Sequence, residues 1–126
     1  MNKNTILEVL GIETIELGEN YIKATMPVDK RTHQPMGLLH GGASAVLIES
    51  LGSIGSSLIA DMKTEGIVGL EVNANHLRGV KSGKVTGTET IIHCGRRTHV
   101  WSVDIHDDEQ KLVCTGRLAV MVTKRS

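Results

Sequence analysis

The stretch His33-Gln-Pro-Met-Gly-Leu-Leu-His-Gly-Gly-Ala-Ser-Ala-Val-Leu-Ile-Glu49-Ser-Leu-Gly-Ser-Ile-Gly-Ser-Ser-Leu-Ile-Ala60 decides the fold, because it joins a glycine-rich turn to the only long apolar helical pattern. After Gly41 and Gly42 the apolar residues recur every three or four positions, which is typical of one face of an α-helix. They are Ala43, Val46, Leu47, Leu51, Ile54, Leu58 and Ile59. Ala45 and Ile48 extend the apolar surface, so we expect the rest of the protein to wrap around this helix.

Glu49 is the single acidic residue inside this apolar segment. An isolated buried carboxylate costs several kcal/mol unless a partner pairs with it or it takes up a proton. The sequence therefore predicts that Glu49 opens onto a cleft; otherwise the helix prediction itself is wrong.

Length and composition predict one domain over residues 1–126. The chain has no Phe, one Trp and one Tyr, so its core must be built from Ile, Val, Leu, Ala and Met. The 14 basic residues equal the 14 acidic ones, and no basic run is long enough to mark a nucleic-acid or anionic-membrane surface. We therefore expect neither nucleic acid nor a membrane as a partner.

The N-terminus lacks the apolar core of a signal peptide, and no stretch approaches ~20 uninterrupted apolar residues. These features predict a soluble cytoplasmic protein. Cys94 and Cys114 each fall inside a strand pattern without a CxxC partner, so we expect two buried free thiols. None of the six histidines shows the spacing of a metal site, and we predict no metal.

Most of the remaining chain alternates between apolar and polar residues, as β-strands do. Before the central helix we expect a short helix over residues 4–10, capped by Asn4 and ended by Gly11, and a hairpin of residues 12–17 and 20–27. After it the pattern predicts strands at 68–75, 84–94, 98–106 and 112–122. In the first of these, Val68, Leu70, Val72 and Ala74 should share one face. The sequence thus predicts an α+β fold, a curved antiparallel sheet of about six strands wrapped around one long central helix.

Three segments together resemble a known family: residues 33–53 above, Gly69-Leu-Glu-Val-Asn-Ala-Asn-His-Leu-Arg78, and Gly95-Arg-Arg-Thr-His-Val-Trp101. They are similar to the hotdog-fold acyl-CoA thioesterases of the phenylacetic-acid-degradation and Arthrobacter-type 4-hydroxybenzoyl-CoA branch. That branch includes hydrolases of 1,4-dihydroxy-2-naphthoyl-CoA. The resemblance covers nearly the whole chain and implies a hotdog fold.

The chemistry of thioester hydrolysis also fits the residues. It needs a nucleophile or base, a donor for the developing oxyanion, and a slot for a long anionic thiol. Glu49 could attack the carbonyl or activate water. The turn at Gly41 and Gly42 opens the helix, where unpaired backbone N–H groups and the positive end of the helix dipole favour an oxyanion.

The resemblance assigns further roles residue by residue. It implies that the backbone N–H of Gly41 is the oxyanion donor, and that Gln34 and His40 orient the thioester and the active-site water. Ser50 and Ser53 match helix positions near the carboxylate that act across a subunit boundary. The resemblance therefore implies a dimer at least, and we expect a homotetramer arranged as a dimer of dimers.

The resemblance also implies a sheet-edge site for coenzyme A, formed by Gly69, His76, Leu77, Arg78, Gly79, His93, Gly95, Arg96, Arg97 and Thr98. The three arginines offer guanidinium groups for phosphates, and a turn at Gly95 exposes backbone N–H groups. Coenzyme A is part of the substrate, so no separate cofactor is expected.

We therefore expect an acyl-CoA thioesterase that acts on an aryl or medium-chain acyl-CoA, with Ser53, Ile54 and residues 34–36 lining the acyl pocket. A non-catalytic acyl-CoA or acyl-carrier binding module is the main alternative. A hotdog dehydratase is a weaker one, because it would need a catalytic His and an acidic partner in a different motif.

Overall fold

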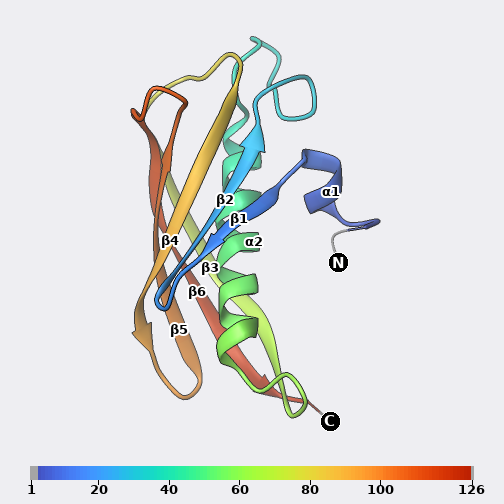
Figure 1. Ribbon diagram of the computed structural model, residues 1–126, viewed down its shortest axis with the longest axis vertical. Coiled ribbons are helices and arrows are strands. Elements are labelled where there is room, and N and C mark those ends of the chain that lie inside the picture. Colours follow the sequence, from blue (N-terminus) through green and yellow to red (C-terminus); the bar gives the residue numbers. More distant parts are fainter. Residues whose placement is uncertain (1–2, 126) are drawn as a thin grey trace.

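One long helix lies across the concave face of a six-stranded sheet in the computed structural model, which describes residues 3–125 (Figure 1). The helix is α2, Gly41–Ile59, and a short helix α1, Ile6–Leu10, precedes the sheet. The strand order is β1-β2-β4-β5-β6-β3, and every neighbouring pair is antiparallel. The strands are β1 Glu13–Leu17, β2 Tyr21–Pro27, β3 Glu65–His76, β4 Lys84–Cys94, β5 Thr98–His106 and β6 Leu112–Lys124. The predicted α+β architecture is confirmed.

Helix α2 forms where the apolar periodicity places it. The Nδ1 atom of His40 accepts a hydrogen bond of 2.7 Å from the Gly42 N–H, which caps the first turn. The face toward the sheet is fully apolar or small: Ala43, Ser44, Leu47, Ile48, Leu51, Gly52, Gly55 and Ser56. By length and composition alone α2 could cross a membrane, but a helix packed into a protein core meets the same test, and this one packs on the sheet.

Small residues on α2 let the sheet approach closely. A Cβ at Gly55 would lie 2.5 Å from the Trp101 ring, so glycine is needed at this contact. The next residue, Ser56, is buried, and its Oγ accepts from Trp101 Nε1 at 2.8 Å and bonds His99 Nδ1 at 2.8 Å. The core therefore includes one large aromatic residue beside the expected aliphatic ones.

Strand β3 lies at one edge of the sheet and differs from its predicted pattern. A β-bulge between Gly69 and Glu71 breaks the alternation, so Val68 and Val72 do not share a face. Val72 packs against the core, whereas Val68 and Leu70 are about half exposed (51% and 52%). The prediction that these apolar residues form one face is wrong for this reason.

Two smaller predictions also need correction. Both cysteines are free thiols, but only Cys114 is buried, because Cys94 lies exposed at the end of β4. At the N-terminus, Asn4 has a left-handed φ of 63° and the N-cap of α1 is Thr5. Gly11 ends this helix as predicted, with φ 72°.

Candidate active site

The first turn of α2 opens onto a cavity of about 390 Å³. The cavity is lined by Gln34, Leu38, Leu39, Gly41, Ser44, His76, Leu77, Arg78, Gly79 and Val113. The amide groups of Gly42 and Ala43 are engaged by His40, through its Nδ1 atom and its carbonyl oxygen. The Gly41 N–H has no partner within residues 3–125, so the positive end of the helix carries one free donor at this cavity.

His76 packs directly against Gly41. A Cβ at position 41 would lie 2.9 Å from His76 Nε2, so only glycine leaves room for this ring without adjustment. On the other side of the cavity, Gln34 sits in a loop closed by Gly37, whose φ is 77°. The Gln34 side chain accepts a hydrogen bond from the Met36 N–H, which fixes its orientation within the loop. The cavity thus joins a free N–H, an imidazole and an amide side chain.

His40 faces a different hollow. Its Nδ1 atom is occupied as the helix cap, and the residue lines a groove of about 220 Å³ together with Leu10, Arg31 and Val46. The structure therefore places His40 next to Gly41 in the chain but outside the lining of the 390 Å³ cavity.

Glu49 is exposed, but it lines neither the 390 Å³ cavity nor the 220 Å³ groove, so its position in a cleft stays a prediction. Its Oε2 lies so close to Gly69 on β3 that any Cβ there would collide with it. Because Glu49 is eight residues beyond Gly41 in the same helix, the two residues lie about 12 Å apart along its axis. Ser50 and Ser53 are half-buried beside it, Ser53 one turn further along α2.

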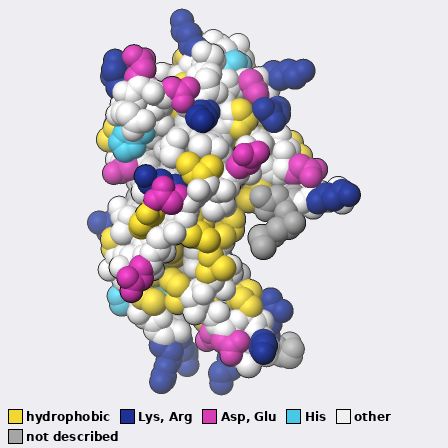
Figure 2. All heavy atoms as spheres, viewed as in Figure 1, with side chains coloured by type: hydrophobic (Ala, Val, Ile, Leu, Met, Phe, Trp, Pro, Cys, Tyr) yellow, Lys and Arg dark blue, Asp and Glu magenta, His cyan; other side chains and the backbone are white. Residues whose placement is uncertain are grey.

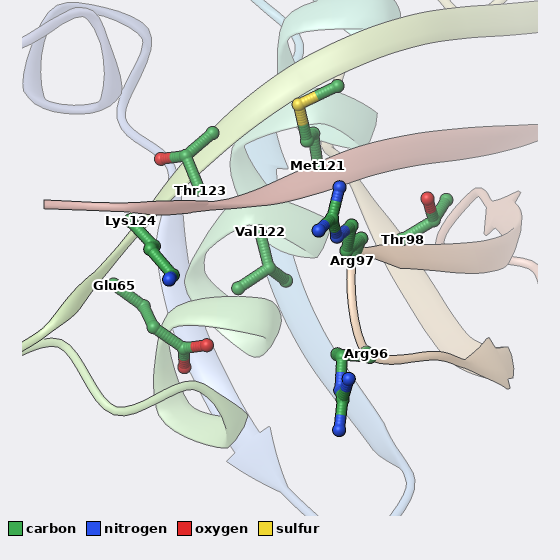
Figure 3. Close-up of a pocket in the computed structure, with 8 residues that line it drawn as sticks. All are labelled: Glu65, Arg96, Arg97, Thr98, Met121, Val122, Thr123 and Lys124. Atoms are coloured by element: carbon green, nitrogen blue, oxygen red, sulfur yellow. The ribbon is translucent and has the colours of Figure 1, made fainter.

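A second, larger cavity of about 810 Å³ lies at the far end of the sheet, where the β4–β5 turn meets β6 (Figure 3). It is lined by Glu65, Arg96, Arg97, Thr98, Met121, Val122, Thr123 and Lys124. Figure 3 shows Glu65 and Lys124 on one side and the two arginines on the other. None of these charged side chains forms an ion pair within the described part of the chain, so the arginines are free to bind an anion.

The residues predicted to bind coenzyme A therefore fall into three places. His76, Leu77, Arg78 and Gly79 join the cavity at Gly41, and Gly69 lies beside Glu49. Arg96, Arg97 and Thr98 line the larger cavity, with His93 and Gly95 next to it at the end of β4. A single chain does not bring these groups into one continuous site.

Sequence reasoning missed one unusual carboxyl group, Glu89 on β4. Its side chain is fully buried (0% exposed), and burial raises its pKa to about 9. Neither carboxyl oxygen has a hydrogen-bond partner among residues 3–125. The signal was present in the sequence, because strand alternation puts Glu89 on the same face as Val85 and Gly87.

Residues 36–114 match the family model of the thioesterase superfamily. The 1,4-dihydroxy-2-naphthoyl-CoA hydrolase of Escherichia coli is 43% identical to this chain, covering 97% of it and 89% of the relative. The proofreading thioesterase EntH of Cronobacter turicensis is 47% identical, covering 94% and 85%.

Among solved structures, a mutant of thioesterase PA1618 from Pseudomonas aeruginosa superposes with a TM-score of 0.97. It is 51% identical, and the match covers 98% of this chain and 89% of that one. The match to the family model and the identity to the relatives agree with the helix-in-sheet architecture described above. The chain belongs to the thioesterase superfamily and is a hotdog-fold thioester hydrolase.

Proposed function

We propose that this protein is an acyl-CoA thioesterase that hydrolyses an aryl or medium-chain acyl-CoA to the free acid and coenzyme A. The observation that carries the proposal is the uncommitted Gly41 N–H at the positive end of α2, which faces an open cavity. A thioester carbonyl oxygen that accepts from this N–H would be stabilised as its negative charge develops.

Glu49 would supply the other half of the chemistry. As a general base it takes a proton from water, whose hydroxyl adds to the carbonyl carbon; the C–S bond then breaks, and the thiolate leaves and takes up a proton. As a nucleophile its carboxylate adds to the carbonyl carbon directly, and water hydrolyses the resulting anhydride. As a nucleophile the carboxylate must lie within about 3–3.5 Å of the carbonyl carbon, whereas as a base it must hydrogen-bond a water molecule that lies at that distance.

Neither distance can be met within one chain, since Gly41 and Glu49 of one helix are about 12 Å apart along its axis. We therefore place Glu49 of a partner subunit opposite Gly41. The free edge of β3, with exposed Val68 and Leu70, supports this arrangement, because edge strands pair with other chains. Figure 2 also shows apolar side chains gathered in the hollow beside α2, between α1 and the chain end, a surface that a second copy would cover.

Pairing two β3 strands antiparallel across a two-fold axis sets the His76 end of one beside the Glu65 end of the other. The cavity at Gly41 in one subunit then approaches the arginine-lined cavity of its partner. Coenzyme A spanning the two would place its phosphates near Arg96 and Arg97, and it enters as substrate, so no separate cofactor is proposed.

Assembly and location extend this proposal. We propose that two such dimers associate as a dimer of dimers, and the exposed Ile92 on β4 is an apolar side chain that a second contact would cover. Both cysteines are free thiols, which fits a reducing compartment, and we propose that the enzyme acts in the cytoplasm.

The deciding experiment measures thiol release from aryl-CoA, medium-chain acyl-CoA and acyl-carrier substrates by the wild-type protein and Glu49→Gln. This substitution keeps the side-chain volume and removes both the base and the nucleophile. We expect kcat to fall by a factor on the order of 10² to 10⁴ while coenzyme A binding, measured by calorimetry, is largely kept. A folded Glu49→Gln protein with more than about a tenth of the activity would remove Glu49 from this role. Coenzyme A binding without any turnover by the wild type would establish the non-catalytic binding module instead.

A further inference from the structure

Glu89 lies directly beneath the helix that carries Glu49. Its Oε2 is 2.6 Å from the position that a Cβ on Gly52 would take, so the carboxyl group occupies the space that this glycine leaves open. Gly52 follows Glu49 by three residues, which is less than one turn of α2. The contact between Glu89 and Gly52 therefore supports the same turn of the helix that presents the proposed catalytic carboxylate.

The surroundings of Glu89 offer no compensating charge. The inner face of α2 carries no ionisable side chain, and neither do the inward residues of the neighbouring strand β2, namely Ile22, Ala24 and Met26. Across the sheet the inward ionisable groups are His99 on β5 and Cys114 on β6. Burial lowers the pKa of His99 and raises that of Cys114, so both are uncharged at neutral pH. Within the part of the chain that the structure describes, an ionised Glu89 would have no partner.

We propose, on the basis of the proposed thioesterase function, that Glu89 is a positioning residue for the hydrolysis. Its un-ionised carboxyl packs under Gly52 and holds the Glu49 turn of α2 against the sheet, and loss of the proton displaces that turn and stops the reaction. A buried carboxylate without a counter-ion is unstable, so the protein must either keep the proton or move the helix to admit water. The pKa of about 9 places this change in the alkaline range.

The chain contains its own reporter for this movement. Trp101 is the single tryptophan, and it packs against Gly55, three residues beyond Gly52 on the same face of α2. Its indole N–H donates to Ser56 Oγ. A shift of α2 away from the sheet would expose this ring and move its fluorescence emission to longer wavelength.

The test compares wild type with Glu89→Gln, whose amide has similar volume and does not titrate. Glu109→Gln removes an exposed carboxylate as the matched control, and Cys114→Ser removes the buried thiol on β6. For each protein we measure kcat/KM on one aryl-CoA thioester at about pH 7.5 and about pH 10, with spontaneous hydrolysis subtracted, and the Trp101 emission without substrate.

We expect kcat/KM of wild type to fall roughly tenfold between the two pH values, as about nine tenths of a group with pKa 9 ionises, with a red shift of Trp101 emission. Both changes should also occur in Glu109→Gln and Cys114→Ser and be absent in Glu89→Gln. An equal fall in Glu89→Gln, or a wild-type emission that does not move, would overturn the inference.

Two safeguards keep the result decisive. If Glu89→Gln does not fold, the infrared carbonyl band of the protonated Glu89 carboxyl can be followed in the wild-type protein. This band should disappear over the same pH range in which the Trp101 emission shifts. A band that persists at pH 10 would refute the inference. The emission measurement needs no substrate. A protein that hydrolyses no thioester but shows the Glu89-dependent shift would therefore contradict the proposed function while supporting the helix contact.

Discussion

Gly41 has a backbone N–H without a partner among the described residues, and it has no Cβ where His76 packs. Gly41→Pro removes the N–H at the first helical position, where proline is well tolerated, and the extended backbone of His40 (φ −73°, ψ 130°) suits a residue before proline. Gly41→Ala adds a Cβ near His76 but keeps the N–H. We expect kcat of Gly41→Pro to lie a further 10² to 10³ below that of Gly41→Ala, on the order of the loss for one oxyanion donor. Equal steady-state rates for the two variants would show that this N–H does not contact the transition state.

Glu89 should also make stability depend on pH. Its pKa is about 9 in the folded protein and 4.5 in the unfolded chain, so between these values the folded state holds one more proton. The contribution of this proton to the free energy of unfolding is complete below about pH 4.5. It is lost as pH rises toward the folded-state pKa, at about 1.4 kcal/mol per pH unit. We expect the free energy of unfolding of Glu89→Gln to lack this pH-dependent contribution. Denaturation at several pH values should therefore give a free-energy difference between variant and wild type that changes steadily from pH 5.5 to 8.5; a constant difference would contradict the prediction.

At the scale of single elements, we propose that α2 lines the acyl pocket. Ser53, one turn beyond Glu49, and the neighbouring Ile54 are half-buried, small or adaptable, and should lie beyond the thioester carbonyl. We expect kcat/KM for the best aryl-CoA to exceed that for acetyl-CoA by roughly 10² or more, because acetyl leaves the pocket empty. Ser53→Leu should lower kcat/KM for aryl-CoA about tenfold or more and leave kcat/KM for acetyl-CoA unchanged. Ser57→Leu adds the same side chain one turn further along α2 and should change the ratio of the two kcat/KM values little. Equal losses on both substrates for Ser53→Leu would place the acyl pocket elsewhere.

The elements also show which features the sequence could predict. The bounds of β4 and β5 agree with the predicted strands because their alternation between turn residues is plain. The bulge between Gly69 and Glu71 in β3 was not predicted, although an isolated glycine such as Gly69 within a strand pattern often marks one. The start of α2 and its free N–H could be predicted from the glycine turn that precedes the apolar helical pattern. The separation of the predicted coenzyme A residues into distant cavities could not be predicted, because it depends on which ends of the strands lie together in the folded sheet.

At the scale of the whole molecule, the proposed shared site predicts complementation. A hybrid of Glu49→Gln with Gly41→Pro contains one site with both substitutions and one site with neither. Complete subunit exchange at equal concentrations makes half of the dimers hybrids, so about a quarter of the wild-type sites should recover. Thiol release from the mixture measures this, with each variant alone as the control and light scattering to verify a dimer or larger assembly. A mixture no more active than its components after verified exchange, or an active monomer, would contradict a site formed by two chains.

The two edges of the sheet are not equivalent. The outer edge on the β1 side is a strand of five residues, whereas β3 presents twelve residues; both strands contain a bulge and expose apolar and acidic side chains, so their length is what distinguishes them. Short edge strands resist further pairing, and long ones invite it. Once two β3 strands have joined, both ends of the combined sheet are β1 strands. In the proposed dimer, growth by strand addition therefore terminates at two copies, and the asymmetry between the two edges that favours this dimer also opposes a fibril.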